Sequence, residues 1–291
     1  MTTNRRHAFF AVFSLSLVLF AFAPLRRVVV FSLHGNTDSS HIILIPFITA
    51  ALLYSRRQMV FKNLQTSVFP AAVMFVAGAV LNYLGRTYAQ GLGESNYLGL
   101  MTGSIIVIWL SGFLAFYGTS AFKGGLFPLL FLCLAIPIPS RVFHETARFL
   151  QHGSAEMVSM LFSLTGTPTY RDNFVFTLPG LTIEVAEECS GIRSTLGIFI
   201  VTLLASNLLL KSNWKRAALL LIAIPISLFK NAVRIATLSL LAIHWDMGFI
   251  TGRLHSEGGI VFMMIGLGLL YPFLALMIRA EAKQFAIGVR S

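Results

Sequence analysis

Residues 185–194 read Val185-Ala186-Glu187-Glu188-Cys189-Ser190-Gly191-Ile192-Arg193-Ser194, and the rest of the chain is organised around this stretch. It holds one of only two cysteines in 291 residues. Glu187, Glu188 and Arg193 all lie within four residues of Cys189, although only 11% of the chain is charged. The stretch also marks the point where a polar segment gives way to a long apolar run. We therefore expect it to place a reactive side chain at the top of a helix.

The composition is that of a membrane protein. The chain is 56% hydrophobic with a mean hydropathy of +0.78, and its 11% of charged residues compares with about 25% in a soluble domain. Basic residues mostly flank apolar runs, so the net charge of +11 indicates membrane topology and an anionic lipid surface rather than nucleic acid. Two cysteines cannot form a disulfide framework, and Cys133 lies inside an apolar run as a small buried side chain would.

Apolar runs near the length of a transmembrane helix recur along the chain, and we predict an all-α polytopic fold with about eight spans. The predicted spans cover residues 8–25, 41–55, 66–84, 97–118, 124–140, 190–210, 217–243 and 256–278. The first could instead be a signal peptide, but Pro24 and the later spans favour a retained helix. With the N-terminus inside, twelve basic residues lie on the inner side and seven on the outer side. This bias supports that orientation, although Arg26 and Arg27 oppose it.

The segment from Val142 to Glu188 is less apolar than its neighbours. Apolar residues recur at helical spacing within residues 143–165, with His144, Arg148, His152 and Glu156 between them, which predicts an amphipathic helix in the membrane interface. Residues 173–178 and 181–186 flank Pro179-Gly180, which suits a type II turn. We predict a short hairpin on the outer surface that delivers Cys189 to the sixth span.

Cys189 is a candidate nucleophile because a helix N-terminus and a nearby cation both favour the thiolate. Arg193 lies one helical turn further on, whereas Glu187 and Glu188 oppose the thiolate. The sequence leaves open whether Cys189 is reactive or simply a small interfacial residue.

Arg234 is a second candidate, because an arginine inside the long apolar run 217–243 is expensive and points to function. At about 1.5 Å per residue it lies about 25 Å above the start of this run, near the outer membrane edge where the sixth span begins. Asn231 shares its helix face, and Lys230 is a possible structural partner. A headgroup-seeking arginine remains the alternative.

His255 opens the last predicted span and is the candidate general base or acid, with His244 as its competitor. Gly258 and Gly259 follow it and would permit close helix approach. Three different spans thus bring Cys189, Arg234 and His255 to one membrane level, and this convergence carries more weight than any one of the three residues.

These motifs resemble the exosortase/archaeosortase family. The resemblance rests on Glu188-Cys189-Ser190-Gly191-Ile192-Arg193, on Asn231-x-x-Arg234-Ile235, and on His255 with the glycines after it. The Ile43-Leu-Ile-Pro46 run with Arg56-Arg57, and Ala135-Ile-Pro-Ile-Pro139, also resemble the N-terminal half of that family. The resemblance covers most of the chain and implies a single exosortase-like transmembrane domain over residues 1–291.

The resemblance implies a membrane-embedded cysteine protease and transpeptidase. Its substrates would be exported proteins with a C-terminal motif (Pro-Glu-Pro in the commonest bacterial case), an apolar helix and a basic tail. Cys189 would form a thioester, His255 would act as base and acid, and Arg234 would stabilise the oxyanion or orient the substrate. Arg193, Asn231 and Glu188 would support the site, without metal or cofactor. The resemblance favours a bacterial inner membrane over an archaeal membrane, with the active site facing outward.

Two alternatives from other classes stay open. A transporter or channel could bind an anion at Lys230 and Arg234. A metal-dependent hydrolase could use Cys189, His244, His255 and Glu257, although their spacing matches no metalloprotease helix such as H-E-x-x-H. The sequence also leaves open whether water or an amine resolves the thioester.

Overall fold

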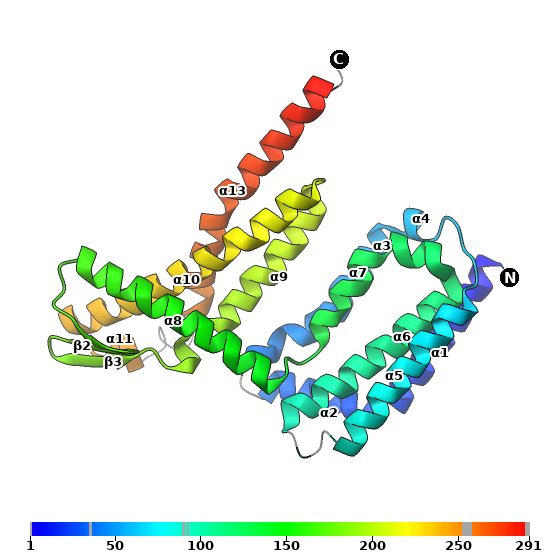
Figure 1. The fold of residues 1–291 in the computed structure, drawn as a ribbon, viewed down its shortest axis with the longest axis horizontal. Coiled ribbons are helices and arrows are strands. Elements are labelled where there is room, and N and C mark those ends of the chain that lie inside the picture. The colour runs from blue at the N-terminus through cyan, green and yellow to red at the C-terminus, as the bar shows by residue number, and fades with distance from the viewer. Residues whose placement is uncertain (1, 35–36, 89–90, 92, 252–257, 289–291) are drawn as a thin grey trace. The chain divides into compact units, whose positions relative to one another are not determined.

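The computed structural model describes residues 2–34, 37–88, 91, 93–251 and 258–288. Its residue contacts divide the chain into two units, Met1–Phe143 and His144–Ser291, and each is described by itself. Both are predominantly helical, with one small sheet in the second (Figure 1). The predicted all-α polytopic membrane fold is therefore confirmed. The prediction of a single domain over residues 1–291 stays a prediction.

The first unit is built around α6, whose residues are buried along most of its length. Its elements are α1 (Thr3–Phe20), α2 (Phe22–His34), η1 (Thr37–Ile43), α3 (Leu44–Ser55), α4 (Arg57–Val60), α5 (Val68–Tyr88), α6 (Glu94–Gly124), α7 (Leu126–Phe131) and η3 (Leu132–Ala135). Helices α5 and α6 lie side by side (Figure 1). Gly78 makes this approach possible, because a Cβ there would lie 2.7 Å from Cγ1 of Ile108. An aromatic cluster of Phe10, Phe113 and Tyr117 joins α1 to α6.

The second unit holds the cysteine segment. Its elements are α8 (Ser140–Leu164, whose first turn contains the boundary between the units), β1 (Tyr170–Asp172), β2 (Val175–Leu178), β3 (Leu181–Glu184), η4 (Glu187–Cys189), α9 (Ile192–Leu209), α10 (Asn213–His244), α11 (Gly248–Thr251) and α13 (Gly259–Gly288). The strands form an antiparallel sheet in the order β1-β2-β3. The predicted hairpin is confirmed: Leu178 pairs with Leu181 across Pro179-Gly180, and Gly180 has a φ of +75°. The strand β1 was not predicted.

Helix α10 takes part in two separate cores of this unit. Near its N-terminus, Leu219 and Ala223 pack with α9 and α13. Further along, Ala232 and Ala236 pack with α8 and the sheet, in a core that includes Phe162 and Phe176. Lys230 and Asn231 lie just before the second core begins, so they stand at the junction between the two.

The described residues contain five helices long and apolar enough to cross a membrane, or up to seven if each of two bent helix pairs counts as one span. The predicted number of eight is not confirmed. The first predicted span is broken at Ala21, where α1 and α2 bend by 73°. The second is a shorter apolar helix, Ser39–Ser55. The fifth gives only α7 and η3, which end at Ala135.

Candidate active site

The segment that carries Cys189 leaves the sheet as a tight turn. The backbone N–H of Val185, 1% exposed, donates to the carbonyl of Phe174 at 2.9 Å. A 3-10 turn follows, in which the N–H of Cys189 donates to the carbonyl of Ala186 at 2.9 Å. Cys189 ends this turn, and α9 begins only at Ile192. The prediction that the helix begins at Cys189 is therefore wrong, because its start is displaced by three residues.

Gly191 produces this displacement. Its φ of +75° lies in the left-handed region, which favours glycine and lets the chain reverse between the 3-10 turn and α9. A Cβ at Gly191 would also lie 2.5 Å from Oδ1 of Asn231 and 2.7 Å from its Cγ. Both the backbone conformation and the contact with α10 therefore require glycine, two residues after the cysteine.

Asn231 holds the cysteine backbone from α10. It is 1% exposed. Its Nδ2 donates to the carbonyl of Cys189 and to Oγ of Ser154, each at 3.0 Å. Because a carbonyl only accepts, the bond to Cys189 fixes which end of the amide is nitrogen. Asn231 thus connects α8, the cysteine turn and α10 at one point. Its supporting role in catalysis stays a prediction.

Arg234 lies one turn further along α10 and is half-buried. It interacts electrostatically with Cys189 and with Arg193. A guanidinium near a thiol favours the thiolate, which is the nucleophilic form. Arg193 is exposed, as the second residue of α9. The structure therefore brings three of the predicted site residues (Cys189, Arg234 and Arg193) into one electrostatic group.

Lys230 is 1% exposed, and its Nζ donates to Oγ of Ser194 on α9. The Ser194 hydroxyl in turn donates to the carbonyl of Gly191 at 3.0 Å. The sequence suggested Lys230 as a structural partner without identifying Ser194. Helical spacing relates residues on one helix, so it could not have revealed a bond between α9 and α10.

Helix α8 contributes polar side chains that were not predicted to belong to the site. Gln151, 9% exposed, donates from Nε2 to the carbonyl of Val185 at 2.6 Å. Nδ1 of His144 lies 2.6 Å from Oε1 of Glu187. Ser154 accepts from Asn231, as described above. The available signal was that Gln151 and Ser154 occur on the apolar face of an amphipathic helix, where buried polar groups need partners.

The remaining predicted residues fall into three cases. Glu188 belongs to the same 3-10 turn as Cys189. His255 and Glu257 lie outside the described residues, so the role expected for His255 stays a prediction. His244 is exposed at the end of α10, about 15 Å along the helix from Arg234. Within the described ranges, no group of three or more His, Cys, Asp or Glu side chains could hold a metal ion.

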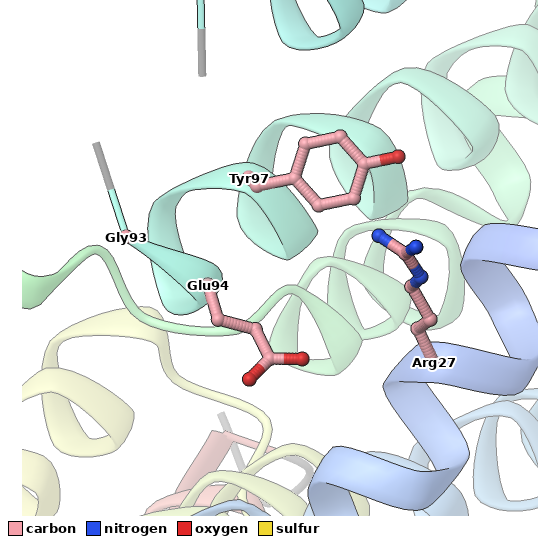
Figure 2. Close-up of a pocket in the computed structure, with 4 residues that line it drawn as sticks. All are labelled: Arg27, Gly93, Glu94 and Tyr97. Atoms are coloured by element: carbon pink, nitrogen blue, oxygen red, sulfur yellow. The ribbon is translucent and has the colours of Figure 1, made fainter. Parts of the chain in front are cut away.

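A cavity of about 360 Å³ lies elsewhere, in the first unit. Arg27, Gly93, Glu94 and Tyr97 line it, and Figure 2 shows the Arg27 guanidinium pointing toward the Tyr97 ring. The guanidinium carbon is 5.8 Å from the ring centroid. None of the predicted site residues lines this cavity.

A comparison with known families identifies the family of the chain. A model of the transmembrane exosortase family (Exosortase_EpsH) matches residues 33–272. The chain belongs to this family. No curated protein and no solved structure shows significant similarity to it. Membership makes this exosortase a multi-pass, membrane-embedded sorting enzyme, and the matched region includes the cysteine turn, α9 and α10.

Proposed function

We propose that the chain is a cysteine-type peptidase and transpeptidase that cleaves the C-terminal sorting signal of exported proteins. The observation that carries the proposal is the hydrogen bond from Nδ2 of Asn231 to the carbonyl of Cys189, which holds the cysteine turn against α10. Arg234 lies three residues after Asn231 on the same helix face, and its electrostatic interaction with Cys189 supports the same placement. Family membership supports the reaction class, because exosortases are sorting enzymes.

The proposed reaction begins when His255 takes the proton of the Cys189 thiol and the sulfur attacks the carbonyl carbon at the cleavage site. Arg234 stabilises the negative charge that develops on the carbonyl oxygen. The C–N bond then breaks, the amine leaves with a proton from His255, and the acyl group remains on sulfur as a thioester. Water or an amine releases this acyl group, giving hydrolysis or transpeptidation. Arg193, Asn231 and Glu188 support the site, and no metal or cofactor takes part.

The proposed substrate carries a short motif of the Pro-Glu-Pro type, an apolar helix and a basic tail. The helix would lie in the bilayer, which would present the motif at the outer face of a bacterial inner membrane. The alternative of an anion transporter using Lys230 and Arg234 has less support, because Lys230 is 1% exposed and bonded to Ser194.

A reporter-cleavage assay tests this proposal. A protein with a C-terminal Pro-Glu-Pro signal is co-expressed with the wild type or with Cys189→Ala, Arg234→Ala or His255→Ala, and its size is followed by immunoblot. We expect the shortened product to disappear in all three variants while each remains in the membrane. Cys133→Ala is the matched control and should cleave normally, because no step of the proposed reaction uses this second cysteine. Cleavage by Cys189→Ala would overturn the cysteine mechanism.

A further inference from the structure

Lys230 is a deeply buried charged side chain close to the cysteine turn. Only 1% of it is exposed, and no ion pair among the described residues includes it. An ammonium group removed from water and left without an acidic partner destabilises a protein unless other groups satisfy it. Such a residue in an apolar helix points to a functional role, and none of the steps proposed above uses it.

The hydrogen bonds of Lys230 lead toward the cysteine. Its Nζ donates to Oγ of Ser194, and Ser194 donates to the carbonyl of Gly191 at 3.0 Å. The same carbonyl accepts from the backbone N–H of Thr195 at 2.9 Å. Gly191 is the left-handed residue that sets the direction of the chain between the 3-10 turn and α9. Lys230 therefore fixes the turn two residues after Cys189.

Neighbouring residues on α10 hold both sides of this turn. Asn231 binds the carbonyl of Cys189, and Lys230 acts through Ser194 on the carbonyl of Gly191. Arg234 lies four residues after Lys230 and so shares its helix face. One short piece of α10 thus positions the turn and also supplies the cation that interacts with the thiol.

Helix α13 encloses the lysine at its base. A Cβ at Gly266 would lie 3.4 Å from Cγ of Lys230 and 2.7 Å from Cδ1 of Ile198. The absence of a side chain at Gly266 therefore lets α13 approach α9 and α10 closely over the lysine stem. The aliphatic part of Lys230 is packed, and its ammonium group is directed to Ser194.

We propose that Lys230 and Ser194 form a positioning pair that holds the Cys189 turn so that the thiol lies in the field of Arg234. The proposal deepens the proposed function and rests on it, because it concerns the same cysteine. It assigns Lys230 neither to substrate binding nor to proton transfer. Losing Ser194 should remove one of the two donors to the Gly191 carbonyl and leave only the Thr195 N–H, and losing Lys230 should remove the group that orients the Ser194 hydroxyl. Either change should loosen the turn, move the thiol away from Arg234 and lower its thiolate fraction.

The rate of alkylation of Cys189 tests this without a substrate. The full chain carrying Cys133→Ser is purified in detergent and treated with iodoacetamide at pH 7, and labelling of Cys189 is followed by mass spectrometry. Lys230→Met and Ser194→Ala should each slow alkylation by about tenfold, since a shift of one pKa unit changes the thiolate fraction by that factor. Arg234→Met serves as the reference variant, because it gives the alkylation rate of Cys189 when the guanidinium is absent.

Matched variants separate positioning from general damage. Ser194→Thr keeps the hydroxyl and should restore a rate within about twofold of the parent. Ser206→Ala removes an equivalent bond on α9, from Oγ of Ser206 to the carbonyl of Leu203 at 3.0 Å, and should leave the rate unchanged. Lys230→Met combined with Arg234→Met should be no slower than Arg234→Met alone, because both act through one interaction. If Lys230→Met does not fold, Ser194→Ala carries the test.

Alkylation of folded Lys230→Met or Ser194→Ala at the parent rate would overturn the positioning pair. The double variant gives a second way to overturn it. If Lys230→Met slows alkylation in the Arg234→Met background by as much as it does in the parent, Lys230 acts on the thiol by its own charge and not through Arg234. Failure of the proposed function gives a different result: the alkylation series follows the expected order, but the wild type does not cleave the reporter.

Discussion

Helices α6 and α10 are the longest helices of their units, at 31 and 32 residues, yet they bury polar groups in different ways. In α6, the hydroxyls of Ser104 and Ser111 return to carbonyls of their own helix, on Met101 and Ile108. In α10, Lys230 and Asn231 direct their side chains to α8, to α9 and to the cysteine turn. Ser104 also accepts from Nδ2 of Asn82 on α5, so the first unit too has an amide that joins two helices. The difference lies in what the bonds reach, because those of α10 reach the turn that carries Cys189, whereas those of Ser104 and Ser111 stay among the helices.

The largest expected effect of breaking this arrangement comes from Gly191→Ala. The left-handed conformation costs about 1–2 kcal/mol with a side chain, and overpacking against Asn231 adds about 1–3 kcal/mol. We expect reporter cleavage to fall by at least about 100-fold, together with a lower unfolding temperature in detergent.

Gly180→Ala is the matched control for Gly191→Ala. Gly180 has the same φ of +75°, but nothing lies within 4 Å of a Cβ placed there. Gly180→Ala should therefore lose only the stability that the left-handed backbone conformation costs an alanine, and it should keep full reporter cleavage. Equal losses of cleavage in the two variants would contradict the role given to the contact with Asn231.

Asn231→Ala should have the next largest effect. It leaves the Cys189 carbonyl and the Ser154 hydroxyl without a buried donor, which costs about 1–3 kcal/mol. Reporter cleavage should fall by more than the loss of folded protein explains, because the cysteine turn loses the hydrogen bond that holds it to α10. Asn82→Ala removes the bond from Nδ2 of Asn82 to Oγ of Ser104 in the first unit and should lower the unfolding temperature without slowing cleavage. Slower cleavage in the Asn82 variant would erase the contrast between α6 and α10.

Glu281→Ala tests the other end of α10, far from the site along the helix. The Glu281 carboxylate accepts from the backbone N–H groups of Lys211 and Ser212, at 2.9 Å each, where α10 begins. Its loss should cost about 0.5–2 kcal/mol, as for other N-terminal caps. The unfolding temperature should drop while cleavage by the folded protein is unchanged. A selective loss of cleavage would mean that the whole helix, rather than residues 230–234, sets the site.

The smallest effect is expected for Arg171→Ala. Nη2 of Arg171 lies 2.8 Å from Oε1 of Glu156 and joins the sheet to α8, but the Glu156 side chain is 71% exposed. Exposed ion pairs contribute about 0–1 kcal/mol. A shift of at most a few degrees in unfolding temperature and normal cleavage are expected. A larger loss would indicate that the sheet, and not only α8 and α10, holds the cysteine turn.

Local signals in the sequence predicted much of the second unit. Pro179-Gly180 specified the hairpin because proline and glycine suit the two central positions of its turn. Strand β1 was missed because it is only three residues long and two of them, Arg171 and Asp172, are charged. The last span was predicted to end at residue 278, but α13 continues to Gly288, since Arg279, Glu281 and Lys283 are compatible with a helix although they are not apolar.

Contacts between separate elements explain what the sequence could not predict. The break at Ala21 is an exception with a local cause, because Pro24 has no N–H to bond the carbonyl of Phe20, although the pattern 8–25 read as one span. Charge in an apolar run identified Arg234 and Lys230 as unusual, and the structure shows what Lys230 binds. The bonds from Asn231 to Ser154 and from Gln151 to Val185 join residues 77 and 34 positions apart. No helical or strand periodicity reaches across such separations.

The contact between Gly191 and Asn231 also limits how this protein can evolve. A side chain at position 191 meets the asparagine amide, and a smaller residue at position 231 removes the donor to Cys189. A change at either position alone is therefore expected to disturb the cysteine turn, so the two residues should change together if they change at all. Replacing Asn231 would first require another donor for the cysteine carbonyl.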